Sequence, residues 1–118
     1  MTEASTSRSG DREVYVHRAV LELPPGADER AVGGAVTVAL CGSWEHDPPC
    51  RWPNNNAGIL DGREFRFRTV FAASPAEEAL VRERIEAGLR AGDWHVLSSG
   101  VGALSNEERV LGERIARS

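Results

Sequence analysis

Both cysteines of the chain stand at the ends of one polar segment, with a histidine between them. Cys41, His46 and Cys50 follow the spacing C-x4-H-x3-C. Thiolate sulfur and imidazole nitrogen are ligands that zinc prefers, and a structural zinc ion usually takes four ligands. The fourth ligand has to come from elsewhere in the chain, and His95 or His17 can supply it. The segment therefore predicts a zinc site made by Cys41, His46, Cys50 and His95.

The same cysteines allow other kinds of chemistry. Cys50 is followed by Arg51, and a neighbouring arginine lowers the pKa of a thiol and raises its thiolate fraction. A nucleophilic cysteine that works with His46 or His95 would make the protein a small thiol-dependent enzyme. A reversible disulfide between Cys41 and Cys50 would make it a redox protein. In a purely structural interpretation, Cys41 packs as a small hydrophobic residue.

Aromatic and amide side chains in this stretch favour binding of a ligand or a partner. Trp44 and Trp52 offer indole rings, and Asn54 begins a run of three asparagines. Indole rings stack on small ligands and peptides, and they are common where partners bind. The predicted ligand-binding residues are Trp44, Arg51, Trp52 and Asn54. The alternative is that the tryptophans only attach this segment to the scaffold and that the asparagines form a turn.

The composition limits the classes of protein to which these residues can belong. Of the 118 residues, 41% are hydrophobic and 27% are charged, as in soluble globular domains. The formal net charge of −4 argues against a nucleic-acid or anionic-membrane surface. Every basic residue is an arginine, so a lysine Schiff base is excluded. We therefore expect a protein or a small molecule as the partner.

The distribution of apolar residues predicts a cytoplasmic protein without a membrane span. No apolar run approaches the roughly 20 residues that cross a bilayer, and the first residues are polar and lack the apolar core of a secretory signal. In the cytoplasm, cysteines are more often thiols, metal ligands or redox partners than structural disulfides. This expectation agrees with a metal or thiol site in the segment.

Hydrophobic patterns predict the elements that hold this segment. Alternating apolar and polar residues indicate four strands, over residues 13–23, 35–41, 64–73 and 94–99. Two capping boxes, Ser74 to Glu77 and Ser105 to Glu108, each begin a helix. The order β-β-β-α-β-α predicts an α+β fold. We expect a two-layer sandwich in which two helices cover one face of a four-stranded, mostly antiparallel sheet.

These elements predict one domain over residues 13–118, after a disordered tail over residues 1–12. Residues 42–63 show no periodicity and are predicted to be a long loop, which in a compact domain is usually functional or disordered. The protein is therefore interpreted as a small binding or accessory domain. It would use residues 41–56 to bind a metal ion, a small ligand or a protein partner. The alternative is a thiol enzyme or redox protein that uses Cys41 or Cys50 with a nearby histidine.

Overall fold

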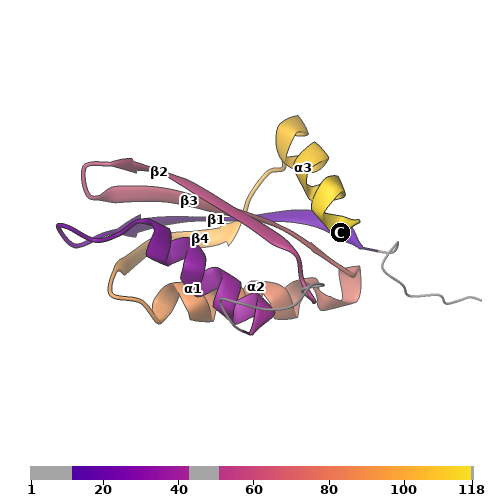
Figure 1. Ribbon diagram of the computed structural model, residues 1–118, viewed down its shortest axis with the longest axis horizontal. Helices are drawn as coiled ribbons and strands as arrows, with labels where there is room; N and C mark the ends of the chain where they lie inside the picture. The colour runs from indigo at the N-terminus through magenta and orange to yellow at the C-terminus, as the bar shows by residue number, and fades with distance from the viewer. Residues whose placement is uncertain (1–11, 43–50, 118) are drawn as a thin grey trace, which may run out of the picture.

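The computed structural model describes residues 12–42 and 51–117. Its elements follow the order β1 (Glu13–Glu22), α1 (Arg30–Cys41), β2 (Asn54–Asp61), β3 (Glu64–Ala73), η2 (Pro75–Glu77), α2 (Glu78–Arg90), β4 (His95–Val101) and α3 (Asn106–Ala116). The strands form one antiparallel sheet in the order β2-β3-β1-β4 (Figure 1). The predicted α+β class and four-stranded antiparallel sheet are confirmed. The connectivity is that of two interlocked split β-α-β units, followed by α3.

The predicted strand over residues 35–41 is wrong, because these residues belong to helix α1. Val32, Val36 and Leu40 recur every four residues and are buried, while Val38 is 44% exposed. A short apolar run has no unique period, and a central Gly-Gly pair is unfavourable in a helix. Gly33 nevertheless allows α1 to pack closely against β2, since a Cβ at this position would lie only 3.2 Å from the Cβ of Asn56.

The predicted order of elements and the predicted loop over residues 42–63 are corrected as well. Asn54–Asp61 within that range forms the edge strand β2, and α1 takes the place of the second predicted strand. Asparagine and glycine are poor strand formers, and most of β2 is exposed, so the sequence has no alternation to read. The two-residue turn at Gly62, with φ at 66°, joins β2 to β3 as a tight hairpin.

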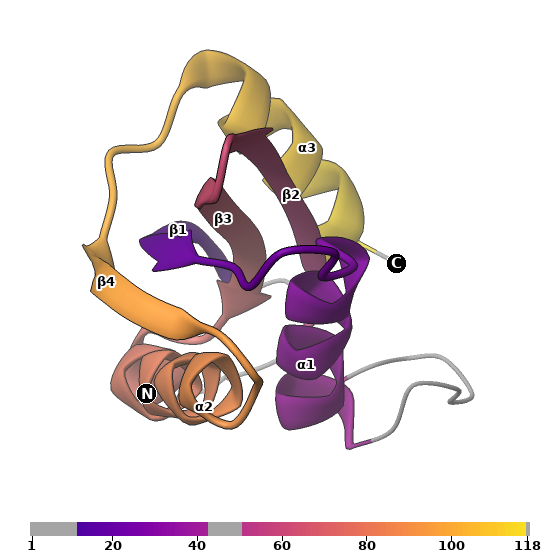
Figure 2. The ribbon, with the colours of Figure 1, turned by 90° about the vertical axis from the view of Figure 1, so that its left-hand side faces the viewer.

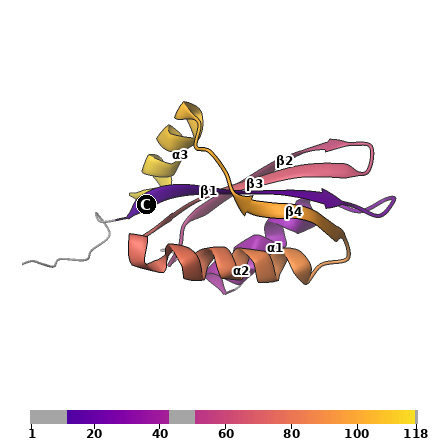
Figure 3. The same ribbon diagram turned by 180° about the vertical axis from the view of Figure 1, so that it is seen from behind.

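The helices lie on both faces of the sheet. Figures 2 and 3 show α1 and α2 against one face and α3 against the other. The core between the sheet and the first two helices contains Leu21, Phe65, Phe67, Phe71, Val36, Leu40, Val81, Ile85 and Leu89. The three phenylalanines of β3 therefore face the core, in agreement with the alternation of apolar and polar residues along this strand.

The two helices that the capping boxes predicted do not share a face of the sheet. On α3, Gly112 packs against Val14 so closely that a Cβ would lie 2.1 Å from Cγ1 of Val14. Val14 lies on the face opposite to the neighbouring Tyr15, which packs against the core. A helical periodicity shows which side of a helix is apolar but not which face of the sheet will receive it.

Only one of the two capping boxes forms. The Ser105 hydroxyl accepts from the backbone N–H of Glu108, and the Glu108 carboxylate accepts from the backbone N–H of Ser105. At Ser74 the hydroxyl instead donates to the Glu77 carboxylate at 3.2 Å, and η2 precedes α2. The predicted tail over residues 1–12 lies, except for Arg12, outside the described residues. Within the described residues, every helix is too short or too polar to cross a bilayer.

Candidate functional site

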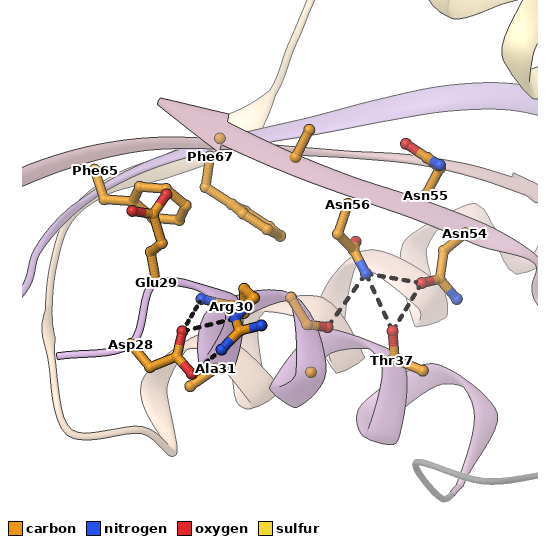
Figure 4. A pocket seen from close by; sticks show the side chains of 14 residues that line it. Asp28, Glu29, Arg30, Ala31, Thr37, Asn54, Asn55, Asn56, Phe65 and Phe67 are labelled. Atoms are coloured by element: carbon orange, nitrogen blue, oxygen red, sulfur yellow. Dashed lines mark hydrogen bonds and ion pairs between the residues drawn. The ribbon is translucent and has the colours of Figure 1, made fainter. Parts of the chain in front are cut away.

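An open groove of about 760 Å³ lies between the first half of α1 and the β2–β3 hairpin. We call it the α1–β2 groove. It is lined by Asp28, Glu29, Arg30, Ala31, Gly33, Gly34, Thr37, Asn54, Asn55, Asn56, Ala57, Gly58, Phe65 and Phe67 (Figure 4). Asn54, which the sequence predicted to bind a ligand, is among these residues.

The apolar side of the groove comes from two phenylalanine rings on β3. Phe65 and Phe67 are both buried, and their ring centroids lie 6.1 Å apart. Gly58 on β2 permits this arrangement, since a Cβ there would lie 2.3 Å from Cζ of Phe65. Gly33 and Gly34 place no side chains on the facing side of α1. The glycines therefore leave the space between hairpin and helix open.

The polar end of the groove is a set of hydrogen bonds that join β2 to α1. Nδ2 of Asn56 donates to the carbonyl of Gly33 at 3.2 Å, to Oγ1 of Thr37 at 3.1 Å and to Oδ1 of Asn54 at 3.1 Å. The Gly33 carbonyl can only accept, so it determines the orientation of the Asn56 amide. Nδ2 of Asn54 donates in turn to the carbonyl of Trp52 at 3.0 Å. The asparagines thus anchor the start of β2 on the helix.

The other end of the groove carries charges at the start of α1. Asp28 accepts from the backbone N–H of Arg30 at 3.0 Å and from its guanidinium Nε at 3.1 Å, and these bonds lower the pKa of Asp28. Glu29 is half-buried at the N-cap position and makes no side-chain capping bond. Figure 4 shows its side chain extending toward Phe65. Among the described residues, no ion pair or hydrogen bond compensates the Glu29 carboxylate.

The strand beside this groove has an open edge. β2 ends the sheet, and the backbone N–H of Ala72 on β3 donates to the carbonyl of Pro53 at 3.0 Å. Backbone groups of an antiparallel strand point alternately toward and away from the partner. Counting from Pro53, the outward-facing backbone groups belong to Asn54, Asn56, Gly58 and Leu60. No described strand pairs with them.

A second polar cluster lies between the sheet and α2, and we call it the His17 network. Nδ1 of the buried His17 is 2.9 Å from Nη1 of Arg82, and Nε2 is 3.0 Å from Oε2 of Glu86 and 2.9 Å from Oγ of Ser99. Arginine can only donate, so Nδ1 accepts and Nε2 carries the proton. The imidazole then has no free lone pair with which to take a proton from Ser99. The network is therefore suited to holding α2 on the sheet rather than to base catalysis.

Burial and these partners shift two pKa values in the His17 network. Desolvation lowers the pKa of His17, and the charge of Arg82 adds to this effect, although the hydrogen bond with Glu86 opposes it. Burial alone would raise the pKa of Glu86, but the hydrogen bonds from Ser99 and His17 outweigh it and leave the pKa lowered. A neutral histidine beside an ionised glutamate is the resulting state at neutral pH.

The predicted ligand-binding residues are divided between buried and exposed positions. Trp52 is buried in the core, and its indole Nε1 donates to Glu77 at 3.2 Å. The Arg51 guanidinium lies 4.4 Å from the Trp52 ring centroid and forms an ion pair with Glu77 at 3.0 Å. Both bonds lower the pKa of Glu77. Trp44 lies outside the described residues, so ligand binding by the two indoles stays a prediction.

The predicted metal ligands are not brought together within the described part of the chain. Cys41 ends α1, where it is disulfide-bonded, and His95 is exposed at the start of β4. No group of three or more described histidine, cysteine or acidic residues is arranged to hold a metal ion. His46 and Cys50 lie outside the described residues. A disulfide sulfur cannot act as a zinc thiolate, so the zinc and redox predictions concern different oxidation states of this segment, and both stay predictions.

The sequence reasoning missed the residues that α1 contributes to the groove. Thr37 belongs to the wrongly predicted strand over residues 35–41, whereas Glu29 and Gly33 lie outside every predicted element. The available signal was the spacing of Val32, Val36 and Leu40, which fits a helix that turns Gly33 and Thr37 toward one side. That signal was weak, because the same run also alternates.

No protein-family model matches this chain, and no curated protein or solved structure is significantly similar to it. The function has to be argued from the geometry of the site, because many unrelated functions share the same folds.

Proposed function

We propose that this domain is a binding module that receives an extended segment of a partner protein along the open edge of β2. The segment would add a fifth strand to the sheet and place alternate side chains into the α1–β2 groove. The observation that supports this function is that the outward backbone groups of β2 run beside a groove that is already open. The proposal keeps the expected role of residues 41–56, since Asn54 and Asn56 belong to both the strand and the groove.

The chemistry of an edge strand favours an extended peptide over a compact ligand. A strand edge offers donors and acceptors at the repeat of another backbone, and strand addition uses them for affinity while neighbouring pockets select side chains. Natural edge strands are commonly protected by charges or prolines. Between Asn54 and Leu60 the strand β2 has neither, and Ile59 and Leu60 are exposed on it. An unprotected edge beside a groove is suited to a binding partner.

Selection of heptapeptides displayed on phage against the immobilised domain tests the proposal. Dissociation constants of the selected peptides are then measured by fluorescence anisotropy. Ala31→Tyr places a bulky ring in the groove and should weaken binding about tenfold or more. Val38→Tyr is the matched control, because Val38 is an exposed α1 residue that does not line the groove. It should change the dissociation constant less than twofold.

A second pair of variants tests the strand addition itself. Leu60→Pro removes an outward N–H that an edge strand does not need, and should weaken binding roughly three- to tenfold. Leu60→Ala keeps that N–H and should leave most of the affinity. If no peptide is selected, or if the selected peptides bind the Ala31→Tyr and Leu60→Pro variants as tightly as the parent domain, the proposed function is wrong.

A further inference from the structure

We infer that the segment bound in the α1–β2 groove carries a basic side chain, which pairs with Glu29 and lies against Phe65. This inference rests on the proposed function and adds the chemistry of the partner. It concerns one position of the bound segment, whereas strand addition concerns its backbone, so the two can fail separately.

The charges of the groove lead to this inference. Three ionisable side chains line it, the carboxylates of Asp28 and Glu29 and the guanidinium of Arg30. Arg30 is engaged by Asp28 through two hydrogen bonds, at 3.1 and 3.3 Å. Among the described residues, the Glu29 carboxylate forms no direct ion pair or hydrogen bond, and its charge acts on Arg30 only through space. It is therefore the charge of the lining that lacks a direct partner. A half-buried carboxylate gains most from a cation that enters the same partly desolvated space.

The surroundings of Glu29 suit a long cationic side chain rather than a small cation. Figure 4 shows the Glu29 side chain extending from the start of α1 toward the Phe65 ring, with Phe67 next to it. The methylene groups of lysine or arginine can cover such rings while the charged end reaches a carboxylate. A cation close to an aromatic face is attracted by it as well. Since Phe65 and Phe67 are only 3% and 4% exposed, such a side chain would touch just the ring atoms that line the groove.

The register of the hairpin places this position along the bound segment. Phe65 lies opposite Leu60, whereas Asn56 lies four residues nearer the start of β2. Side chains of a strand that face the same way recur every second residue. Beyond the position next to Gly58, a further inward-facing residue of the segment would meet Asn56, whose Cβ leaves only 3.2 Å to a Cβ built at Gly33. The bound segment should therefore carry a basic residue followed or preceded, at even spacing, by a small one.

A second copy of this chain is a poorer occupant of the groove. If β2 paired with β2 of another copy, the inward-facing residues brought to the groove would be Asn54, Asn56, Gly58 and Leu60. None of these residues is basic, so Glu29 would stay uncompensated. Charge complementarity favours a different protein as the partner.

The test repeats the phage selection with the parent domain, with Glu29→Gln and with Glu83→Gln. Glu83 is an exposed α2 residue away from the groove, so its variant changes the net charge equally. Peptides selected by the parent domain and by Glu83→Gln should be enriched in lysine or arginine at one position. Glu29→Gln should lose that enrichment and weaken binding of a lysine-containing peptide about fivefold at low ionic strength. With the lysine changed to methionine, the parent domain and Glu29→Gln should bind equally.

The outcomes separate the two proposals. In one outcome, Leu60→Pro and Ala31→Tyr weaken peptide binding, but the selected peptides show no enrichment in lysine or arginine. This outcome would overturn this inference and leave the binding function standing. Peptides insensitive to those two variants would overturn the binding function, whatever their charge. In a third outcome, the parent domain sediments as a dimer and the Leu60→Pro variant sediments as a monomer. This outcome would show that β2 pairs with β2 of a second copy, and the inferred partner would be wrong.

Discussion

His17 is buried on β1, and the residues that face it come from α2 and β4. Arg82 of α2 forms a hydrogen bond with Nδ1 of the imidazole. Glu86 of α2 and Ser99 of β4 both lie within hydrogen-bond distance of Nε2. Thr69 lies beside it on β3. The folded protein holds this imidazole neutral. As the pH decreases, the free energy of unfolding should therefore fall through His17 before it falls through the carboxylates.

The first prediction concerns this pH dependence. An unfolded histidine has a pKa of about 6.5, and the pKa of His17 in the folded protein is lower. Below about pH 6.5 the unfolded chain therefore binds a proton that the folded protein does not, and the free energy of unfolding should decrease as the pH falls. The slope from one histidine is at most about 1.4 kcal/mol per pH unit. Urea unfolding between pH 7.5 and 5 measures it.

Two variants assign this pH dependence to His17. His17→Gln keeps an acceptor for Arg82 and a donor for Glu86 but cannot be protonated, so its stability should change less with pH in this range. His95→Gln removes an exposed histidine outside the network and should leave the slope as it is. Glu86 contributes mainly below this range, because its pKa is lowered from 4.5 and its contribution to stability is lost only as the pH falls toward and below that value. Equal slopes for the parent domain and His17→Gln would refute the assignment.

The second prediction concerns two threonines with opposite roles. Among the described residues, Oγ1 of the buried Thr69 has no hydrogen-bond partner, whereas Oγ1 of Thr37 accepts from Asn56 at 3.1 Å. Thr69→Val should raise the free energy of unfolding by about 1 kcal/mol, and Thr37→Val should lower it by a similar amount. Thermal and urea unfolding of both variants give the comparison. A destabilised Thr69→Val would mean that this hydroxyl is hydrogen-bonded after all.

At the scale of elements, one carboxylate links α3 to two strands of the sheet. Glu108 caps its own helix through Ser105 and also pairs with Arg18 at 2.9 Å and Arg68 at 3.4 Å. Burial alone would raise the pKa of Glu108, but the hydrogen bonds from Ser105 and the charge and hydrogen bond of Arg18 leave it lowered. Among the described α3 residues, only Gly112 is buried, and it packs against Val14, whereas Leu111 and Ile115 are partly buried. Ionic contacts should therefore matter more for α3 than for α1 or α2.

The third prediction compares the two arginines on the α3 side of β3. Arg68 donates to the carbonyl of Asn55 at 2.8 Å and pairs with Glu108, with its side chain 22% exposed. Arg66 is 56% exposed and lies 4.0 Å from Glu64. Arg68→Ser should lower the free energy of unfolding by about 1–3 kcal/mol and speed amide exchange in α3. Arg66→Ser should change it by less than about 0.5 kcal/mol. Similar effects of both changes would show that Arg68 does not hold α3.

For the whole molecule, the interlocked connectivity explains where the groove lies. β1 pairs with both β3 and β4 and takes the centre of the sheet, so β2 is left at one edge. The chain reaches that edge through α1, which packs against β2 and α2 (Figure 2). The proposed binding edge and the helix that lines the groove are therefore consecutive in the chain. An open edge of this kind is a cost to any sheet protein unless a partner uses it.

The sequence by itself determined the α+β class, the alternating strands β1 and β3 and the capping box of α3. Each depends on local chemistry, such as the alternation of Phe65, Phe67 and Phe71 or the reach of Ser105 to Glu108. It also singled out Asn54.

Only the tertiary structure decided that Val36 to Leu40 is helical, since burial of every fourth residue against the sheet outweighed the local preference. The strand at Asn54–Asp61 exists because β3 pairs with it, and Glu29 faces Phe65 because hairpin and helix meet there. Such contacts join residues far apart in the chain, and no local pattern encodes them.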